Sequence, residues 1–340
     1  MGTVQLYHLV LWWAALTSQK IADGQEASPL KRLQRKEQHS QYQHHQQHSK
    51  QQRRDRGERS AVNATISPYA IAMCSGHTAL STKPDMQKVF ENHRQYAAKH
   101  NYTYLLQTVP LVDDSGKEVA AYWTKISLIK KLLRPPHTFD WVFWIDSDAI
   151  VVNMAQSIEN LLHDPTHNIV LESSSRPVTS LIFSGDTNAI NDGVLLFRRT
   201  DYSHYIIDEV IKIGAKLDAA GVRIGMGADN AAFSIFLGGC NSSMQHSTYQ
   251  QCFDRVNLGF NQETVREIKP VKKLICAGDR AIYAKMIEPS ILLHVAPLPQ
   301  RAFQGYSEET AQFVIHFPGP RPNKFEKLSE VLATIKPTRR

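Results

Sequence analysis

From residue 67 onward, continuous apolar runs alternate with stretches of helical periodicity. Tyr69–Cys74 and Trp141–Ile145 are apolar throughout, which is typical of strands buried on both faces. Between them, residues 85–100 and 119–133 carry apolar side chains at helical spacing, and Tyr102–Leu106 predicts another strand. The resulting order β-α-β-α-β predicts a parallel sheet with right-handed crossovers. Ligands of such a sheet bind at the carboxyl ends of its strands.

The second half of the chain predicts shorter elements. Long helices begin at Asp201 and Asp229, and a closing helix covers 323–335. Strands are expected at Ile169–Glu172, Val194–Arg198, Lys272–Cys276, Ile291–Val295 and Val314–His316. We therefore expect an α/β domain over residues 66–338.

The N-terminal segment differs in composition from this domain. The apolar run Val4–Leu16 is short for a membrane span and contains Gln5 and His8. Residues 1–22 are therefore either a cleaved signal peptide or a signal-anchor, and both direct the chain to the secretory lumen. Residues 23–65 are rich in Gln, His and Arg with little to bury, which predicts a disordered stem.

The charge of the chain is concentrated in that segment. The whole chain has a net charge of +7, of which residues 1–60 supply +5, from 10 Lys/Arg and 5 Asp/Glu. The remaining residues are nearly neutral, so we expect no nucleic-acid binding.

The four cysteines, at 74, 240, 252 and 276, form no C-x-x-C motif. A zinc finger or a thioredoxin-like site is therefore not expected. Three pairings are open. We favour Cys240–Cys252, which would close a polar loop, and we expect Cys74 to be a buried thiol in a strand.

Two carboxylates follow the apolar strand Trp141–Ile145 directly, at Asp146 and Asp148. Alternate residues of an extended chain point the same way, so both can face one hard cation at the end of the strand. Mg²⁺ and Mn²⁺ take carboxylate oxygens and leave positions for phosphate. The alternative is a pair of turn carboxylates that cap a helix.

Three shorter motifs add candidate chemistry. In His316-Phe-Pro-Gly319 the imidazole can complete a site that prefers Mn²⁺ to Mg²⁺, and Arg321 can bind phosphate. Asn191-Asp-Gly193 is also typical of a turn. Asp229 can cap a helix or, with Asn230, orient sugar hydroxyls.

Taken together, these motifs resemble glycosyltransferase family 34, which includes fungal α-galactosyltransferases, mannan α-mannosyltransferases and plant xyloglucan α-xylosyltransferases. The resemblance covers about residues 66–335. It rests on Tyr122–Leu133 with its Trp-x-Lys helix, on Trp144-Ile-Asp-Ser-Asp-Ala149, and on Asn191-Asp-Gly, Asp229-Asn and His316-Phe-Pro-Gly in the order of the family.

The resemblance implies a GT-A type fold, a Rossmann-like mixed sheet flanked by helices. It also implies a site. Asp146, Asp148 and His316 would be metal ligands for Mn²⁺, and Asp229 and Asn230 would lie near the reacting carbon. Donor binding is assigned to Ser75, Lys125, Asp146, Ser147, Asp148, Asn191, Gly193 and Arg321. The chain departs from the xylosyltransferases at Ala228 and Asn230, where they tend to have Asp and Gln.

The implied activity is a retaining, Mn²⁺-dependent transfer from a nucleotide sugar to a glycan acceptor, an oligosaccharide, polysaccharide or glycoprotein. UDP-galactose or UDP-xylose is favoured over GDP-mannose. The implied location is the Golgi membrane, as a single-pass type II protein whose catalytic domain is lumenal. An oligomer with itself or with other glycosyltransferases is compatible with this. The alternative is a catalytically silent relative that acts as a partner subunit or lectin.

Overall fold

The computed structural model describes residues 67–76, 84–111, 118–186, 189–222, 224, 228–256, 275–307, 311–318 and 323–335. The N-terminal segment, the stem and Arg321 lie outside the described residues. Among the described helices, none combines the length and apolar character that crossing a bilayer requires.

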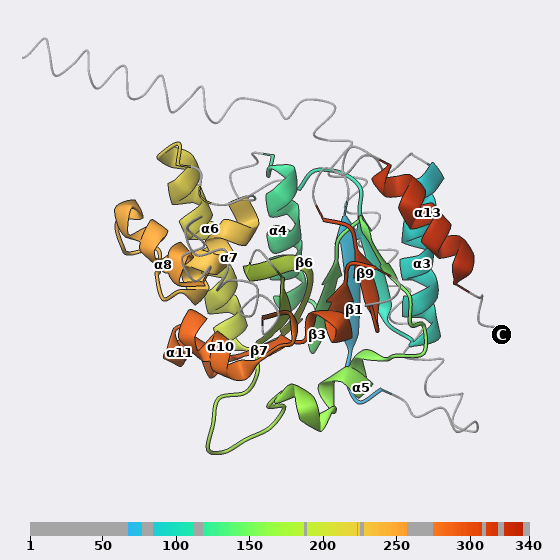
Figure 1. Ribbon diagram of the computed structural model, residues 1–340, viewed down its shortest axis with the longest axis horizontal. Coiled ribbons are helices and arrows are strands. Elements are labelled where there is room, and N and C mark those ends of the chain that lie inside the picture. The colour runs from blue at the N-terminus through green and yellow to red at the C-terminus, as the bar shows by residue number, and fades with distance from the viewer. Residues whose placement is uncertain are drawn as a thin grey trace, which may run out of the picture. The chain divides into compact units, whose positions relative to one another are not determined.

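A six-stranded sheet forms the centre of the described part of the chain (Figure 1). Its strand order is β2-β1-β3-β6-β5-β7. The bounds are β1 Ile71–Gly76, β2 Thr103–Gln107, β3 Trp141–Ile145, β5 Leu181–Asp186, β6 Ala189–Arg198 and β7 Val295–Leu298.

The pairing confirms the predicted α/β fold. Strands β2, β1 and β3 are parallel and are connected by α3 (Pro84–Lys99) and α4 (Ala121–Leu133). Strand β6 is antiparallel to both β3 and β5, and β7 is parallel to β5. The sheet is therefore mixed, and the carboxyl ends of β1 and β3 meet at the same edge, as the sequence predicts.

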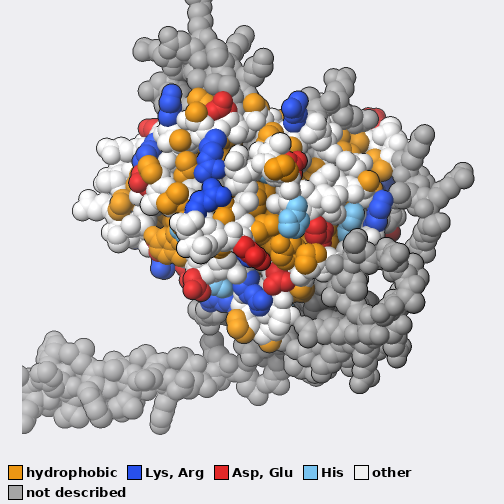
Figure 2. All heavy atoms as spheres, turned by 90° about the horizontal axis from the view of Figure 1, so that it is seen from below, with side chains coloured by type: hydrophobic (Ala, Val, Ile, Leu, Met, Phe, Trp, Pro, Cys, Tyr) orange, Lys and Arg blue, Asp and Glu red, His pale blue; other side chains and the backbone are white. Residues whose placement is uncertain are grey.

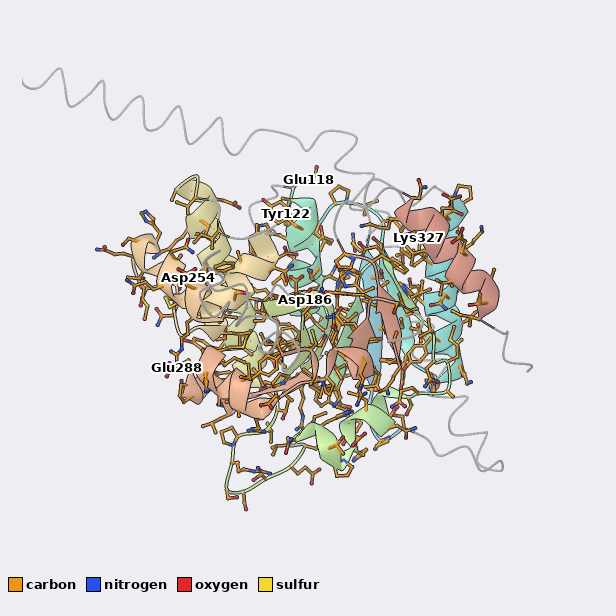
Figure 3. All side chains as sticks on the ribbon, viewed as in Figure 1. Glu118, Tyr122, Asp186, Asp254, Glu288 and Lys327 are labelled. Carbon is orange, nitrogen blue, oxygen red and sulfur yellow. A yellow bond between two sulfur atoms is a disulfide. The ribbon has the colours of Figure 1, made fainter. Side chains whose placement is uncertain are left out.

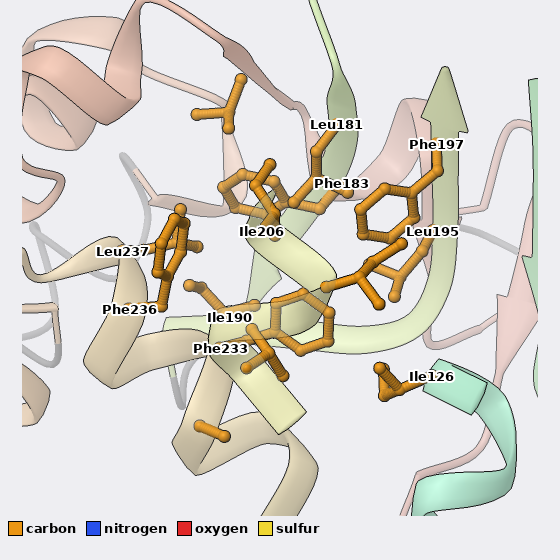
Figure 4. Packing of buried hydrophobic residues seen from close by; sticks show 14 of the residues in the cluster. Ile126, Leu181, Phe183, Ile190, Leu195, Phe197, Ile206, Phe233, Phe236 and Leu237 are labelled. Carbon is orange, nitrogen blue, oxygen red and sulfur yellow. The ribbon is translucent and has the colours of Figure 1, made fainter. Parts of the chain in front are cut away.

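Helices α4, α6 (Asp201–Ala219) and α7 (Ala228–Leu237) pack against one another and against the sheet. The largest hydrophobic cluster lies here. Figure 4 shows Ile126 of α4, Phe197 of β6, Ile206 of α6 and Phe233 of α7 converging in one layer. Ile126 and Ile206 are among the apolar positions at helical spacing in the sequence, and burial of such faces stabilises the helices against the sheet.

A second hydrophobic cluster covers the other face of the sheet, where a small second sheet lies. In the described residues its order is β4-β9-β8, with bounds Ala149–Val151, Val314–His316 and Gln304–Gly305. Helix α13 (Lys324–Thr334) packs beside α3 (Figure 1). The remaining helices are α5 Ile158–Leu162, η1 Pro165–His167, η2 His246–Thr248, α8 Tyr249–Val256, α10 Arg280–Met286, α11 Pro289–Leu292 and α12 Gln300–Phe303.

Two buried polar side chains of α3 attach strand β4 to the domain. The Asn92 amide donates to the Val151 carbonyl at 2.9 Å and accepts from the Val151 N–H at 2.8 Å. His93 Nε2 lies 2.8 Å from the Ala149 carbonyl oxygen. Because that oxygen only accepts, Nε2 carries the proton. The strand that follows Asp148 is therefore held by side-chain hydrogen bonds at both ends.

His93 predicts an acid-sensitive stability. Burial lowers the pKa of His93 from 6.5 to about 4, although its bond to Ala149 opposes the shift. The unfolded chain takes up this proton first, so the contribution is complete above pH 6.5 and is lost as the pH falls toward 4. Between pH 7 and 4.5 we expect the free energy of unfolding to fall about 2–3 kcal/mol more in the wild type than in His93→Gln. Urea melts at both pH values measure this difference. An equal fall in the free energy of unfolding of the two proteins between these pH values would refute the prediction.

The cysteine predictions are confirmed. Cys240 and Cys252 form a disulfide, and Cys74 is a buried free thiol in β1. Burial raises the pKa of Cys74 far above its usual value, so the thiol stays protonated.

Four local predictions are corrected. Residues 169–172 form no strand. Residues 291 and 292 end the helix α11, and β7 begins only at Val295. Of Lys272–Cys276, the described residues 275 and 276 are helical, and the others lie outside the described residues. Asn191–Gly193 forms no turn but lies within β6. Short apolar runs do not separate strand from helix, and a paired neighbouring strand overrides turn chemistry.

On the face of the molecule seen in Figure 2, the described residues show no dominance of one charge. Figure 2 shows a face on which acidic, basic and hydrophobic side chains are interspersed. This agrees with the near-neutral composition of the sequence after residue 60.

Candidate active site

Asp146 and Asp148 lie in the connection between β3 and β4, on either side of Ser147. The Asp146 N–H donates to the Gly193 carbonyl of β6 at 2.8 Å. The Phe317 N–H donates to the Asp148 carbonyl at 3.0 Å. Each residue is thus anchored to a different neighbouring strand, and the turn at Ser147 turns both carboxylates toward the end of β9.

His316, at the end of β9, meets both carboxylates. Its Nε2 lies 3.2 Å from Asp148 Oδ1 and 3.8 Å from Asp146 Oδ2. One ligand atom from each of the three side chains lies within 4.8 Å of the others. Two carboxylate oxygens and an imidazole nitrogen are donors suited to a divalent ion, so this group can hold one. The convergence predicted from the sequence is observed.

Lys324 also reaches this group, which sequence reasoning missed. Its Nζ lies 2.7 Å from Asp148 Oδ2. Desolvation alone would raise the pKa of Asp148, but His316 and Lys324 together hold it well below its usual range. Asp148 is therefore an anion at neutral pH. The only signal in the sequence was that Lys324 opens the helix that follows His316.

Trp144 orients the other carboxylate. Its indole N–H donates to Asp146 Oδ1 at 2.6 Å, which leaves Oδ2 toward His316. Desolvation raises the pKa of Asp146, Lys125 opposes this shift, and the neighbouring Asp148 adds to it. A cation shared by the two carboxylates would relieve this repulsion.

Gly193 makes room for the histidine ring. A Cβ built at Gly193 would lie 2.0 Å from His316 Cε1, and the ring is buried. The glycine of Asn-Asp-Gly is therefore required by a close approach within the protein.

Gly193→Ala is accordingly expected to displace the imidazole and to weaken metal binding by about 10–100-fold, the usual effect of disturbing a ligand's support. Isothermal titration with Mn²⁺ measures this. Gly221→Ala is the control, because a Cβ there meets nothing within 4 Å, although its φ is +63°. Metal affinity unchanged in Gly193→Ala would show that the ring has another place to lie.

A second cluster surrounds the buried Lys125 of α4. Its Nζ lies 2.8 Å from Asp192 Oδ1, 3.0 Å from Asp229 Oδ2 and 3.8 Å from Asp146 Oδ1. It also donates to the Asp192 carbonyl at 3.1 Å. An ammonium has three N–H groups, so contacts within the protein occupy them all. Asp192, the middle residue of Asn-Asp-Gly, was not singled out from the sequence.

The charges of this cluster shift the pKa values of Asp192 and Asp229 in opposite directions. Desolvation alone would lower the pKa of Lys125, but Asp146, Asp192 and Asp229 hold it well above its usual value. Desolvation and the nearby Asp229 raise the pKa of Asp192, whereas Lys125 outweighs desolvation at Asp229 and lowers its pKa. Asp229 is therefore the anion of the pair, and Asp192 is the member that binds a proton first.

Asn191 is also engaged by its neighbours. Its Nδ2 donates to Asp186 Oδ2 at 2.9 Å and to Tyr306 Oη at 2.7 Å, and the Tyr306 hydroxyl donates to Asp186. Its Oδ1 accepts from the Gly193 N–H at 2.9 Å. Figure 3 labels Asp186, which lies near the middle of the molecule, whereas Lys327 lies out on α13. These hydrogen bonds of the Asn191 side chain therefore hold the first residues of β6 in place.

Of the other predicted residues, some lie at one of these two clusters and others do not. Asn230 Oδ1 accepts from the Asp192 N–H at 3.1 Å, which places Asn230 beside the lysine cluster. Ser75 is fully buried in β1, and its hydroxyl has no hydrogen-bond partner among the described residues. Ser147 lies in the turn between the two aspartates, and Arg321 lies outside the described residues.

The chain matches known proteins over its described domain. The model of the galactosyl transferase GMA12/MNN10 family matches residues 71–324. A probable xyloglucan 6-xylosyltransferase of Arabidopsis thaliana is 32% identical over 101 residues, which are 29% of this chain and 21% of that protein. An alpha-1,2-galactosyltransferase of Schizosaccharomyces pombe is 23% identical over 149 residues, 37% of this chain and 39% of that protein. The matches thus span less than half of these relatives.

Among solved structures, the chain is similar to a glycosyltransferase involved in the glycosylation of the major capsid of PBCV-1. The TM-score is 0.43 and the identity 16%, over 76% of this chain and 99% of that one. The family match, together with the mixed sheet, confirms the predicted glycosyltransferase fold of GT-A type. The resemblance to glycosyltransferase family 34 is likewise confirmed: the chain belongs to the galactosyl transferase GMA12/MNN10 family.

Proposed function

We propose that this chain is a retaining, Mn²⁺-dependent glycosyltransferase that moves a sugar from a nucleotide sugar to a glycan acceptor. The observation that carries the proposal is the convergence of Asp146, Asp148 and His316 at the carboxyl end of β3. The imidazole nitrogen supports Mn²⁺ over Mg²⁺, since Mn²⁺ accepts nitrogen more readily. Asp146, Asp148 and His316 would hold a divalent ion there, whose charge would neutralise that of a departing diphosphate.

The chain's own residues supply the rest of the chemistry. Lys324 is a cation next to Asp148 and can add a second positive charge for the diphosphate, a role that the resemblance gives to Arg321. Asp229 and Asn230 lie beside the Lys125 cluster and are our candidates for the groups nearest the reacting carbon. Asn230 would stabilise the oxocarbenium-like centre from the face opposite the leaving group.

Lys125, Asn191 and Gly193 act, in this proposal, mainly by holding these groups in place. The contacts of Lys125 and Asn191 lie within the protein, and Gly193 accommodates His316. The departing phosphate can take the acceptor's proton, so we assign no general base. A donor sugar then meets a site whose carboxylates are already oriented.

The family relatives guide the choice of donor. Those quoted are named as a xylosyltransferase and a galactosyltransferase, which supports UDP-xylose or UDP-galactose over GDP-mannose. We further propose a type II protein of the Golgi membrane, in which the N-terminal segment serves as anchor. The intact metal-binding group weighs against a silent partner subunit or lectin.

A donor screen tests this function. The full chain is incubated with Mn²⁺, mixed glycan acceptors and one of UDP-galactose, UDP-xylose, UDP-glucose or GDP-mannose, and the released nucleotide and the glycan product are measured. We expect release and product with one UDP-sugar. Release with none of the four donors, from folded protein, would favour the silent relative.

A further inference from the structure

Gln304 joins the metal-binding group to strand β6. It lies in β8, is completely buried, and bridges two segments with the two ends of its side-chain amide. Its Nε2 donates to the Asn191 carbonyl at 3.0 Å. Its Oε1 lies 3.1 Å from His316 Nδ1. Neither the motifs of the sequence nor the proposed chemistry includes this residue.

The direction of these two bonds follows from donor and acceptor chemistry. A backbone carbonyl only accepts, so the amide must turn its nitrogen to Asn191 and its oxygen to His316. That oxygen also only accepts, so Nδ1 of the ring must carry a proton. Nε2, the atom that faces Asp146 and Asp148, is then the nitrogen whose proton a metal ion would replace.

We propose that Gln304 is a positioning residue that selects the Nδ1–H tautomer of His316 and thereby makes Nε2 the metal ligand. This inference rests on the proposed function, since it concerns the same metal site. Outer partners of this kind fix the tautomer and orientation of histidine ligands.

The surroundings confine the ring. Gly193 lies against it where any Cβ would come within 2.0 Å of Cε1, and the ring is buried. The Asn191 carbonyl that orients Gln304 belongs to a residue whose side chain is bound by Asp186 and Tyr306. Gln304 and Tyr306 therefore connect His316 to the first residues of β6 through hydrogen bonds.

Two substitutions of Gln304 separate the amide's chemistry from its bulk. Gln304→Met keeps the length but removes the acceptor, and we expect the dissociation constant for Mn²⁺ alone to rise about 10–100-fold. In Gln304→Glu a carboxyl oxygen still accepts from Nδ1–H, so the constant should stay within roughly threefold of wild type. Gln156→Met is the control, since among the described residues the Gln156 amide donates to the neighbouring Ser157 carbonyl and contacts no site residue. Isothermal titration on the full chain measures all four proteins.

A spectroscopic readout needs neither bound metal nor activity. In ¹⁵N NMR of the metal-free wild type, Nδ1 of His316 should carry a proton, whether or not Nε2, which faces Asp148, carries one as well. Its signal is assigned by its loss in His316→Ala. Gln304→Met should shift the population toward Nε2–H, and Gln304→Glu should restore Nδ1–H. A wild-type Nε2–H tautomer, or an unchanged tautomer in Gln304→Met, would overturn the inference. A wild type that is Nδ1–H but binds no Mn²⁺ would support the inference and refute the proposed function.

Discussion

Asp148→Asn is expected to reduce sugar transfer by at least about 10³-fold, because it removes a charged ligand from the site where leaving-group charge is neutralised. The change also removes the anion that pairs with His316 and Lys324. Affinity for Mn²⁺ should fall with activity. The fold should persist, because the backbone contacts of Asp148 do not involve its carboxylate.

Asp140→Asn is the matched control for this change. Asp140 immediately precedes the same strand, β3, at its other end, and its ion pair with Arg199 is half-exposed. Transfer assays, Mn²⁺ titration and thermal melts of both variants separate a metal role from a structural one. An Asp148→Asn enzyme with wild-type activity and unchanged metal dependence would remove Asp148 from the site.

Lys125→Met is expected to lower the free energy of unfolding by about 3–5 kcal/mol, because it leaves buried carboxylates without their cation. Asp192 and Asp229 each lie within 3.0 Å of the ammonium that would be lost. Without it, the folded-state pKa of Asp229 rises above its unfolded value, and that of Asp192, which burial already raises, rises further. Their protonated forms then favour folding, so the deficit should shrink as the pH falls from 8 to 5 and grow as it rises.

Lys130→Met controls for the loss of a charge on α4. Lys130 pairs with Asp208 at 2.9 Å, but both side chains are about 30% exposed (29% and 32%). Exposed pairs contribute little, so this variant should lose about 1 kcal/mol at most. Denaturant melts of both variants at pH 5 and pH 8 give the comparison. Equal losses, or a Lys125→Met deficit that does not change with pH, would contradict the picture of a buried cation holding two carboxylates.

The parts of the fold that the sequence predicted well are those where one physical signal dominates. The apolar run Trp141–Ile145 became β3, and the helical spacing after Asp201 became α6, because a uniform or strictly periodic pattern has one way to be buried. The run at Ile291–Val295 failed because a short apolar stretch suits a helix end as well as a strand. Strand β5 carries no distinct pattern and was not predicted.

The residues of the candidate site also divide into those with a recognisable sequence signal and those without one. Asp146, Asp148 and His316 were found because each lies beside a recognisable strand end or motif. Gln304 and Lys324 were missed because neither belongs to a motif, and only the folded chain shows that they contact His316 and Asp148. The contacts of Lys125 likewise could not be read from spacing, since three different strand and helix ends supply them.

The most direct test of the account compares transfer activity in Mn²⁺ and Mg²⁺ for the wild type and His316→Ala. The wild type should be more active with Mn²⁺, because the Nε2 ligand favours that ion. His316→Ala should lose most activity, and what remains should show a smaller Mn²⁺ advantage, with a melting curve to confirm that the variant is folded. An unchanged Mn²⁺:Mg²⁺ activity ratio in folded His316→Ala would contradict the assignment of His316 to the metal site.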